Sequence, residues 1–152
     1  MDKGYLASDI IRQCSRLDEA GISYNFFYLT GISGAGRGNI GAKATAEVCN
    51  QLHPVRIGAN MLTVYSESGL YQEIQKGNWK EEEELEKYME LRTLVKKLKI
   101  PVYFGALGAS NAFQLQGILP RDKEKLLYTL DRITETVSEE ELQRYRRDLP
   151  HL

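Results

Sequence analysis

Cysteine, net charge and long apolar runs are all scarce in this chain of 152 residues. Its two cysteines, Cys14 and Cys49, lie far apart, which argues against a disulfide framework or a metal site and favours buried free thiols. The formal net charge is −1, so we expect neither a nucleic-acid nor an acidic-membrane partner. No apolar stretch is long enough to span a membrane and no signal peptide is visible, which together with the free thiols indicates the cytoplasm.

The composition is that of one ordinary globular domain, with 42% hydrophobic and 27% charged residues. Apolar periodicity predicts helices and strands in alternation. The predicted strands are 22–29, 55–62 and 100–106. The predicted helices are 8–20, a segment capped by Asn39, 69–76, 80–98 and a helical tail over about 120–147. This order predicts an α/β fold of three parallel strands with flanking helices.

The predicted strands differ in their faces. Residues 22–29 are apolar on both faces, which predicts a strand covered on both sides. Within 55–62, one face carries Arg56, Gly58 and Asn60, so that face is expected to border something other than packed core.

Other segments are predicted from local signals. Ser8 and Gly21 are expected to cap the two ends of the first helix, and Ser138 and Glu141 form a predicted capping box. The acidic run "KEEEELEK", 80–87, suits the positive end of a helix dipole and is interpreted as a solvated face. Residues 107–120 are predicted to be an irregular loop.

Five glycines, at 31, 34, 36, 38 and 41, lie within the stretch "YLTGISGAGRGNIGAKA". Gly36 to Gly41 reads G-x-G-x-x-G between a strand and a helix, the context of a dinucleotide-binding loop. However, the next strand lacks the expected terminal acid, and Ala42 stands where a triphosphate-binding loop has lysine. A nucleotide- or phosphate-binding loop and a purely conformational turn both stay open.

Four stretches together resemble the C-terminal half of a radical S-adenosylmethionine (SAM) enzyme, in the subgroup similar to oxygen-independent coproporphyrinogen oxidase and its uncharacterised relatives. Residues 1–34 resemble the helix and fifth strand of that barrel. "TGISGAGR" resembles the adenine-binding pattern G-x-I-x-G-x-x-E. Ile32 and Gly34 match it, whereas Thr30 and Arg37 replace the first glycine and the acid.

The other two stretches lie further along the chain. "NMLTVYSESGLY" resembles the sixth-strand pattern through Asn60, Leu62 and Leu70, with Glu67-Ser68-Gly69 in place of Gly-Thr-Pro. "SNAFQLQGILPRDKEKLL" resembles a tail common in these proteins, although Leu107-Gly108 stands where many relatives have Asp-His.

The resemblance implies a fold and a site. Residues 1–152 would form the C-terminal half of a partial (β/α)6 TIM-like barrel. The adenine side of the SAM site would comprise Thr30, Gly31, Ile32, Ser33, Gly34, Asn60 and Leu62. The pocket of a small-molecule substrate, whose identity stays unknown, would include Arg37, Arg56, Ser110 and Asn111. Ile32 and Leu62 would supply the apolar contacts, and the glycines would expose backbone to the ring edge.

The family's [4Fe–4S] cluster is held by Cys-x3-Cys-x2-Cys, which this sequence does not contain. SAM and the cluster are therefore expected in a full-length parent, from which "MDKGY" reads as an internal sequence. For this chain alone we expect no bound cofactor, no catalytic residue and no activity. The alternatives are a self-contained α/β module that binds a nucleotide or phosphate at Gly31–Gly41, and an interaction protein. Exposed sheet edges would favour a homo-oligomer.

Overall fold

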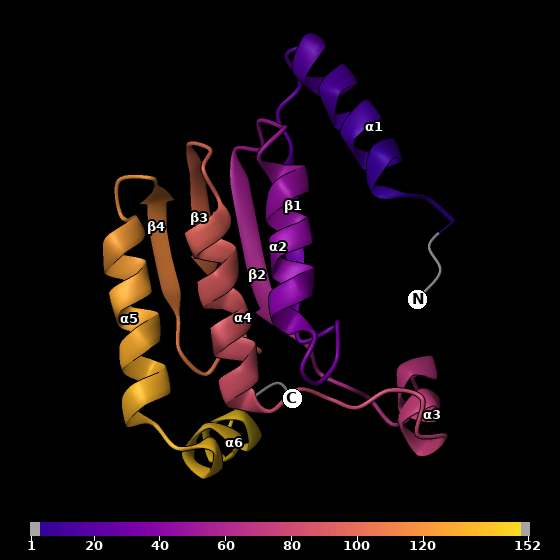
Figure 1. Cartoon of the computed structure of the whole chain (residues 1–152), viewed down its shortest axis with the longest axis vertical. Helices are drawn as coiled ribbons and strands as arrows, with labels where there is room; N and C mark the ends of the chain where they lie inside the picture. Colours follow the sequence, from indigo (N-terminus) through magenta and orange to yellow (C-terminus); the bar gives the residue numbers. More distant parts are fainter. Residues whose placement is uncertain (1–3, 150–152) are drawn as a thin grey trace.

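The computed structural model describes residues 4–149, so the first three residues of the stretch "MDKGY" lie outside the described part. Within that part, helices and strands alternate as predicted, in an α/β fold (Figure 1). The strands are β1 (Asn25–Thr30), β2 (Arg56–Met61), β3 (Val102–Ala106) and β4 (Leu115–Leu119). The helices are α1 (Ala7–Glu19), α2 (Gly38–Cys49), α3 (Gly69–Gln75), α4 (Glu84–Lys97), α5 (Lys123–Thr136) and α6 (Glu139–Arg147).

The sheet has the order β1-β2-β3-β4 and is mixed rather than wholly parallel. β1, β2 and β3 are parallel, as predicted, whereas β4 pairs antiparallel with β3. The prediction of an irregular loop over 107–120 was therefore wrong for Leu115–Leu119, where buried Leu115, Gly117 and Leu119 alternate with exposed Gln116 and Ile118. A short connection suffices for such a strand because antiparallel neighbours need no crossover.

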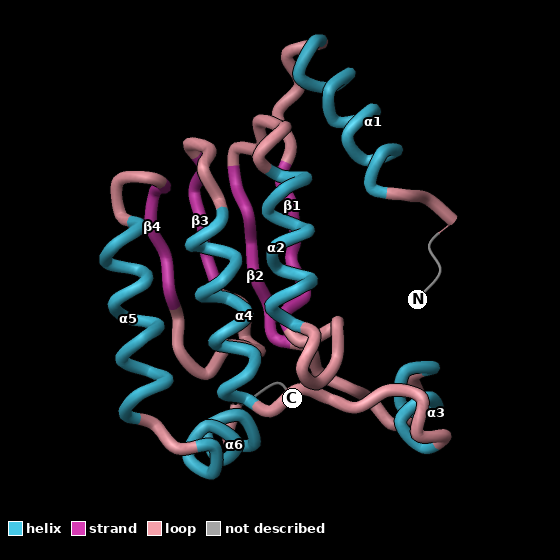
Figure 2. Tube along the Cα trace, in the orientation of Figure 1, coloured by secondary structure: helices cyan, strands magenta, loops and turns pink. Residues whose placement is uncertain are grey.

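Three helices, α2, α4 and α5, cover one face of the sheet (Figure 2). The hydrophobic core lies between these helices and the sheet. It includes Ile57, Phe104, Leu91 and Leu130, each at most 1% exposed. The opposite face is open, and Phe27 on β1 is 79% exposed there. The prediction that strand 22–29 is covered on both sides was therefore wrong. Apolar side chains can favour a second layer, but they cannot show that one is present.

The predictions of the residues that cap the helices were only partly correct. Glu141 N–H donates to Ser138 Oγ in the predicted capping box, and Gly21 has a φ of +67°. At α1, however, the first-turn cap is Asp9, whose carboxylate accepts from Leu6 N–H at 2.9 Å, rather than Ser8. Asn39 lies inside α2 and not at its cap, which is Arg37.

The two thiols are buried and free, as predicted, and burial raises the pKa of each. In the part of the chain that the structure describes, no helix is both long enough and apolar enough to cross a membrane.

Candidate ligand site at the carboxyl ends of the strands

The glycine-rich loop that follows β1 uses its backbone amides to bind carboxylates of the chain itself. Gly31 N–H donates to Glu90 Oε2 at 2.6 Å, and Gly36 N–H donates to Glu86 Oε1 at 3.1 Å. Between them, Ala35 N–H donates to the Lys80 carbonyl at 2.9 Å. The backbone of the glycine-rich loop is therefore covered by the segment that leads into α4 and by α4 itself.

Two buried carboxylates lie behind this loop. Glu90 is fully buried, and its second oxygen accepts the hydroxyl of Tyr28. Glu82 is 4% exposed, and neither of its oxygens has a hydrogen-bond partner among residues 4–149. It lies against Gly38, where a Cβ would come within 2.5 Å of Oε1. Burial first, and the charge of Glu90 second, raise the pKa of Glu82 to about 8, which favours its protonated form at neutral pH.

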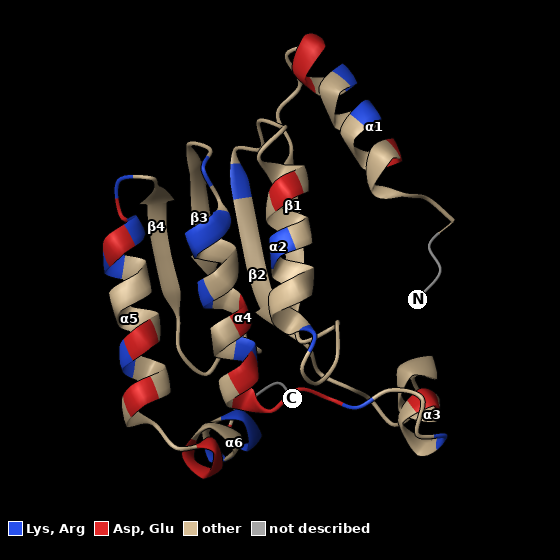
Figure 3. Cartoon of the chain, in the orientation of Figure 1, with Lys and Arg blue, Asp and Glu red and all other residues tan. Residues whose placement is uncertain are grey.

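The acidic run 80–87 is not the solvated face that its composition predicted. Glu82, Glu84 and Lys87 are all buried. Lys87 Nζ lies 2.8 Å from Glu81 and 2.7 Å from Glu84, so opposite charges pair as they leave water. Figure 3 shows acidic residues at the start of α4 next to α6, which carries both acidic and basic residues. The basic residues of α6 lie far along the chain from the acidic run. The number of charges in the run therefore could not predict that its members would be buried.

An apolar cavity of about 560 Å³ opens at the carboxyl ends of β1 and β2. Its apolar walls are Leu29, Ile32, Leu62, Val64 and Leu70. The structure thus brings together Ile32 and Leu62, the two residues expected to contact adenine, and adds Leu70 from the same sixth-strand stretch. They meet because β1 and β2 are adjacent parallel strands, and Leu62 N–H donates to the Thr30 carbonyl at 2.9 Å.

The remaining adenine-side residues, Thr30, Gly31, Ser33, Gly34 and Asn60, do not line this cavity. Thr30 is buried, and the Gly31 amide is occupied by Glu90. A Cβ at Gly34 would lie 2.7 Å from Trp79 Nε1. The expectation that Gly31 and Gly34 leave backbone open to a ligand is therefore corrected, since protein side chains fill that space.

The four residues expected around a substrate do not share one cavity. Asn111 is buried, and its Nδ2 donates to the carbonyls of Ala59 at 3.1 Å and Gly108 at 3.2 Å, which holds the loop after β3 against β2. The Ser110 carbonyl accepts from Arg146.

The two arginines of that set lie elsewhere. Arg56 is exposed on the open sheet face, with its guanidinium 5.2 Å from the centroid of the Tyr103 ring. Arg37 is exposed at the start of α2.

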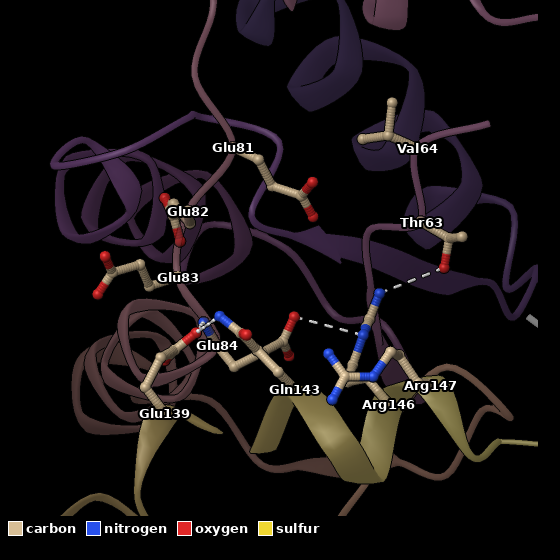
Figure 4. Close-up of a pocket in the computed structure, with 10 residues that line it drawn as sticks. All are labelled: Thr63, Val64, Glu81, Glu82, Glu83, Glu84, Glu139, Gln143, Arg146 and Arg147. Carbon is tan, nitrogen blue, oxygen red and sulfur yellow. Dashed lines mark hydrogen bonds and ion pairs between the residues drawn. The ribbon is translucent and has the colours of Figure 1, made fainter. Parts of the chain in front are cut away.

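A second, charged cavity of about 480 Å³ adjoins the apolar one and shares Thr63 and Val64 with it (Figure 4). Its other lining residues are Glu81, Glu82, Glu83, Glu84, Glu139, Gln143, Arg146 and Arg147. This cavity was not predicted from the sequence, although the acidic run 80–87 supplies several of its residues.

Arg146 lines the charged cavity and also binds the backbone of Leu62, which lines the apolar one. Its guanidinium donates to the Leu62 carbonyl at 2.8 Å and to the Ser110 carbonyl at 2.9 Å. Its Nε lies 3.3 Å from Glu84. The C-terminal helix is thereby fixed to the ends of β2 and of the loop after β3.

Within residues 4–149, no group of three or more His, Cys, Asp or Glu side chains is arranged to hold a metal ion. The described residues therefore supply no ligand set for an iron–sulfur cluster. No protein-family model matches the chain, and neither a curated protein nor a solved structure matches it. Membership of the radical SAM family therefore stays a proposal.

Proposed function

We propose that the chain is the C-terminal half of a radical SAM enzyme's partial barrel and that its apolar cavity receives the adenine of SAM. One observation carries this proposal. Ile32 and Leu62, which come from two separate stretches that resemble the family, line one cavity at the carboxyl ends of adjacent parallel strands. In α/β barrels, ligands bind at that end of the strands.

The chemistry of the cavity suits adenine. The ring needs apolar contacts on its faces, and Leu29, Ile32, Leu62 and Leu70 are aliphatic. Polar groups are needed only at the edge, where Thr63, Ser68 and Glu73 are available. The cavity volume lies within the usual range for small-molecule sites, roughly 300–1,000 Å³.

The open face of the sheet supports the barrel interpretation. Phe27, Gly58, Gly105 and Gln116 lie side by side in one row across that face, so beyond Phe27 on the edge strand this row is small and polar. In a barrel, the face without helices points to the interior, and substrate would lie where that interior opens at the carboxyl ends of the strands. Arg56 and Asn60 are on the same face of β2 as Gly58, because side chains alternate along a strand.

This chain would contribute only part of the complete site. The cluster that cleaves SAM would come from a segment with the three-cysteine motif, and the enzyme would act in a reducing compartment such as the cytoplasm. Without the cluster and ribose contacts, SAM should bind the isolated chain with a Kd of about 1 mM or weaker, about −4 kcal/mol at best.

The alternative of a phosphate-binding loop at Gly31–Gly41 has less support. The amides of Gly31 and Gly36 already donate to carboxylates, so these two donors are not free for a phosphate. Glu86 and Glu90 would also repel a phosphate placed beside them.

Titration of the ¹⁵N-labelled chain separates the two possibilities. Adenosine should shift the amide resonances of Ile32, Leu62 and Leu70, and inorganic phosphate should leave the amides of residues 31–41 in place. Leu70→Asp should remove the adenosine shifts, whereas Ile40→Asp, at an exposed position outside the cavity, should not. Adenosine shifts confined to the glycine loop, or none near its solubility limit, would contradict the adenine site.

The barrel interpretation has its own test. The reading frame upstream of the codon for Met1 should encode a further segment that contains Cys-x3-Cys-x2-Cys. A native start site at that codon would contradict the assignment as half of a barrel while leaving the adenosine titration to be judged separately.

A further inference from the structure

Residues 79–83 connect α3 to α4 and cover the glycine-rich loop without being part of a helix or strand. Figure 1 shows α3 apart from the sheet, with this connecting segment leading back to the start of α4. The Lys80 carbonyl accepts Ala35 N–H at 2.9 Å, and Trp79 Nε1 lies 2.7 Å from the position that a Cβ on Gly34 would take. Because the segment has no regular structure, its contacts decide whether it stays on the loop.

Glu82 is the residue of the connecting segment that is buried, at 4% exposed. Its carboxyl group is in contact with Gly38 at the start of α2, where a Cβ would come within 2.5 Å of Oε1. As an ionised carboxylate, Glu82 would lack a donor for either oxygen in the described part of the chain. As a protonated acid it is itself a donor, and the carboxylate of Glu90 is the acceptor beside it.

Glu90 is better supplied with donors than Glu82. It accepts the Tyr28 hydroxyl on one oxygen and Gly31 N–H, at 2.6 Å, on the other. Hydrogen bonds to a carboxylate favour its ionised form, so a single proton between the two acids belongs on Glu82. The closed segment is then joined to the middle of α4 by a hydrogen bond from Glu82 to Glu90.

Other charged groups around Glu82 come from several elements. The charged cavity of Figure 4 adds side chains of the segment itself, of α4 and of α6: Glu81, Glu83, Glu84, Glu139, Arg146 and Arg147. On β1, burial raises the pKa of Tyr28, which therefore stays neutral. On α4, the charge of Glu86 favours the protonated form of Glu82, and the charge of Lys87 opposes it. Lys87 is already paired with two other glutamates, so it is not free to neutralise Glu82.

We propose that the proton shared by Glu82 and Glu90 holds the connecting segment over the glycine-rich loop, and that loss of this proton releases the segment. Two ionised carboxylates would then face each other away from water, which is unfavourable. Glu90 is fixed within α4, whereas Glu82 belongs to a segment without regular structure, so the segment is the part that moves. Its release would uncover Gly34 and Ala35 and would remove one wall of the charged cavity.

The direction of the pH dependence follows from the environment of Glu82. Burial, and next the charge of Glu90, raise the pKa of Glu82 to about 8 from the ordinary 4.5, so the closed form keeps its proton below this value and loses it above. The ratio of ionised to protonated Glu82 should rise from about 1:100 at about pH 6 to about 30:1 at about pH 9.5. Release of the segment should follow the same curve.

Trp79 reports on the segment because it is the single tryptophan. Quenching of its fluorescence by acrylamide should increase roughly two-fold between about pH 6 and about pH 9.5, while far-UV circular dichroism stays constant. The carboxyl resonance of Glu82 in the ¹³C-glutamate-labelled chain should titrate with the same midpoint. Titration of Glu82 with unchanged quenching would overturn the proposal. Quenching that rises only together with a loss of circular dichroism would also contradict it, because the whole chain would then be unfolding.

Glu82→Gln should abolish the rise in quenching, because its amide can still donate to Glu90 but cannot ionise. Glu83→Gln, the same change at the adjoining exposed position, is the matched control and should retain the rise. A rise that persists in Glu82→Gln would refute the role of this proton.

Gly38→Ala tests the contact without changing a titratable group, and it serves where Glu82→Gln does not fold. The added Cβ should displace Glu82, so Trp79 should be quenched at about pH 6 as strongly as in the wild type at about pH 9.5. Gly69→Ala is the matched control, since Gly69 also begins a helix but no atom lies within 4 Å of its Cβ position. Equal quenching in the two variants at low pH would show that Glu82 does not hold the segment in place.

Discussion

The amide of Gly31 donates a 2.6 Å hydrogen bond to the carboxylate of Glu90, a residue 59 positions further along the chain. This contact joins the end of β1 to the middle of α4 across the core. Together with the bond from Gly36 N–H to Glu86, it shows that two amides of the glycine-rich loop bind carboxylates of the protein itself. The cavity proposed to receive adenine lies beside the loop, against Ile32 and Leu62.

Glu90→Gln should destabilise the fold. Glu90 accepts from Gly31 N–H and from the Tyr28 hydroxyl, and an amide would turn its NH2 toward one of these donors. We expect the free energy of unfolding to fall by about 2 kcal/mol in urea titrations at about pH 6. Glu135→Gln, at an exposed position, is the control and should change it by less than about 0.5 kcal/mol. Equal decreases of the unfolding free energy in Glu90→Gln and Glu135→Gln would contradict a specific contribution of the Glu90 hydrogen bonds.

The stability of the fold should decrease as the pH rises toward 8. Burial, then the charge of Glu90, raise the pKa of Glu82 to about 8 from an ordinary value of 4.5. Between these values the folded chain retains a proton that the unfolded chain has released, so raising the pH favours unfolding. The loss is complete above the folded pKa and is on the order of a few kcal/mol.

The matched variant for this effect is Glu82→Gln, which keeps the shape of the protonated acid. Its unfolding free energy should vary far less between about pH 5 and pH 8 in urea titrations. Asp122 cannot mimic the effect, because its pKa is lowered to about 2 and its contribution is lost only below the ordinary value of 3.8. A wild-type protein equally stable at both ends of the range would contradict the role of Glu82.

Gly34→Ala should be more harmful than Gly36→Ala. Both glycines have positive φ, +81° and +74°, but only at Gly34 would a Cβ meet Trp79 and the Lys80 carbonyl, at 2.7 and 3.0 Å. Gly36→Ala should cost about 1 kcal/mol from backbone strain alone, and Gly34→Ala about 3 kcal/mol. Trp79 is the single tryptophan, so its fluorescence should change in Gly34→Ala and stay the same in Gly36→Ala. Equal stability and equal fluorescence of the two variants would mean that the position of Trp79 does not require a glycine at residue 34.

The isolated chain should self-associate through β1, an edge strand whose Phe27 is 79% exposed. Exposed apolar edge strands pair with further strands. Light scattering at micromolar concentration should report a dimer or larger species, and Phe27→Lys should shift it toward the monomer. Tyr128→Lys, at an exposed position on α5, is the control and should leave the assembly intact. A monodisperse wild-type monomer would contradict this prediction.

Local patterns in the sequence were enough to predict the order of helices and strands. The alternation of apolar residues, the capping box of Ser138 and Glu141 and the positive φ of Gly21 all depend on residues within a few positions of one another. The meeting of Ile32 and Leu62 was also predictable, because sequential strands in such folds are usually neighbours. β4 was missed because five alternating residues next to a glycine-containing loop are too short a signal.

Composition and periodicity by themselves determined that the chain is an α/β protein with free thiols, and the resemblance to radical SAM enzymes singled out Ile32 and Leu62 at adjoining strand ends. Only the tertiary structure decided that Glu82, Glu84, Lys87 and Glu90 are buried, that one face of the sheet is open and that a cavity of mixed charge lies beside Arg147. The physical reason is the range of the interactions. A helix or strand is favoured by near neighbours, whereas a charge enters the interior only with a partner, and here Arg146 and Gly31 reach the acids of α4 from distant parts of the chain.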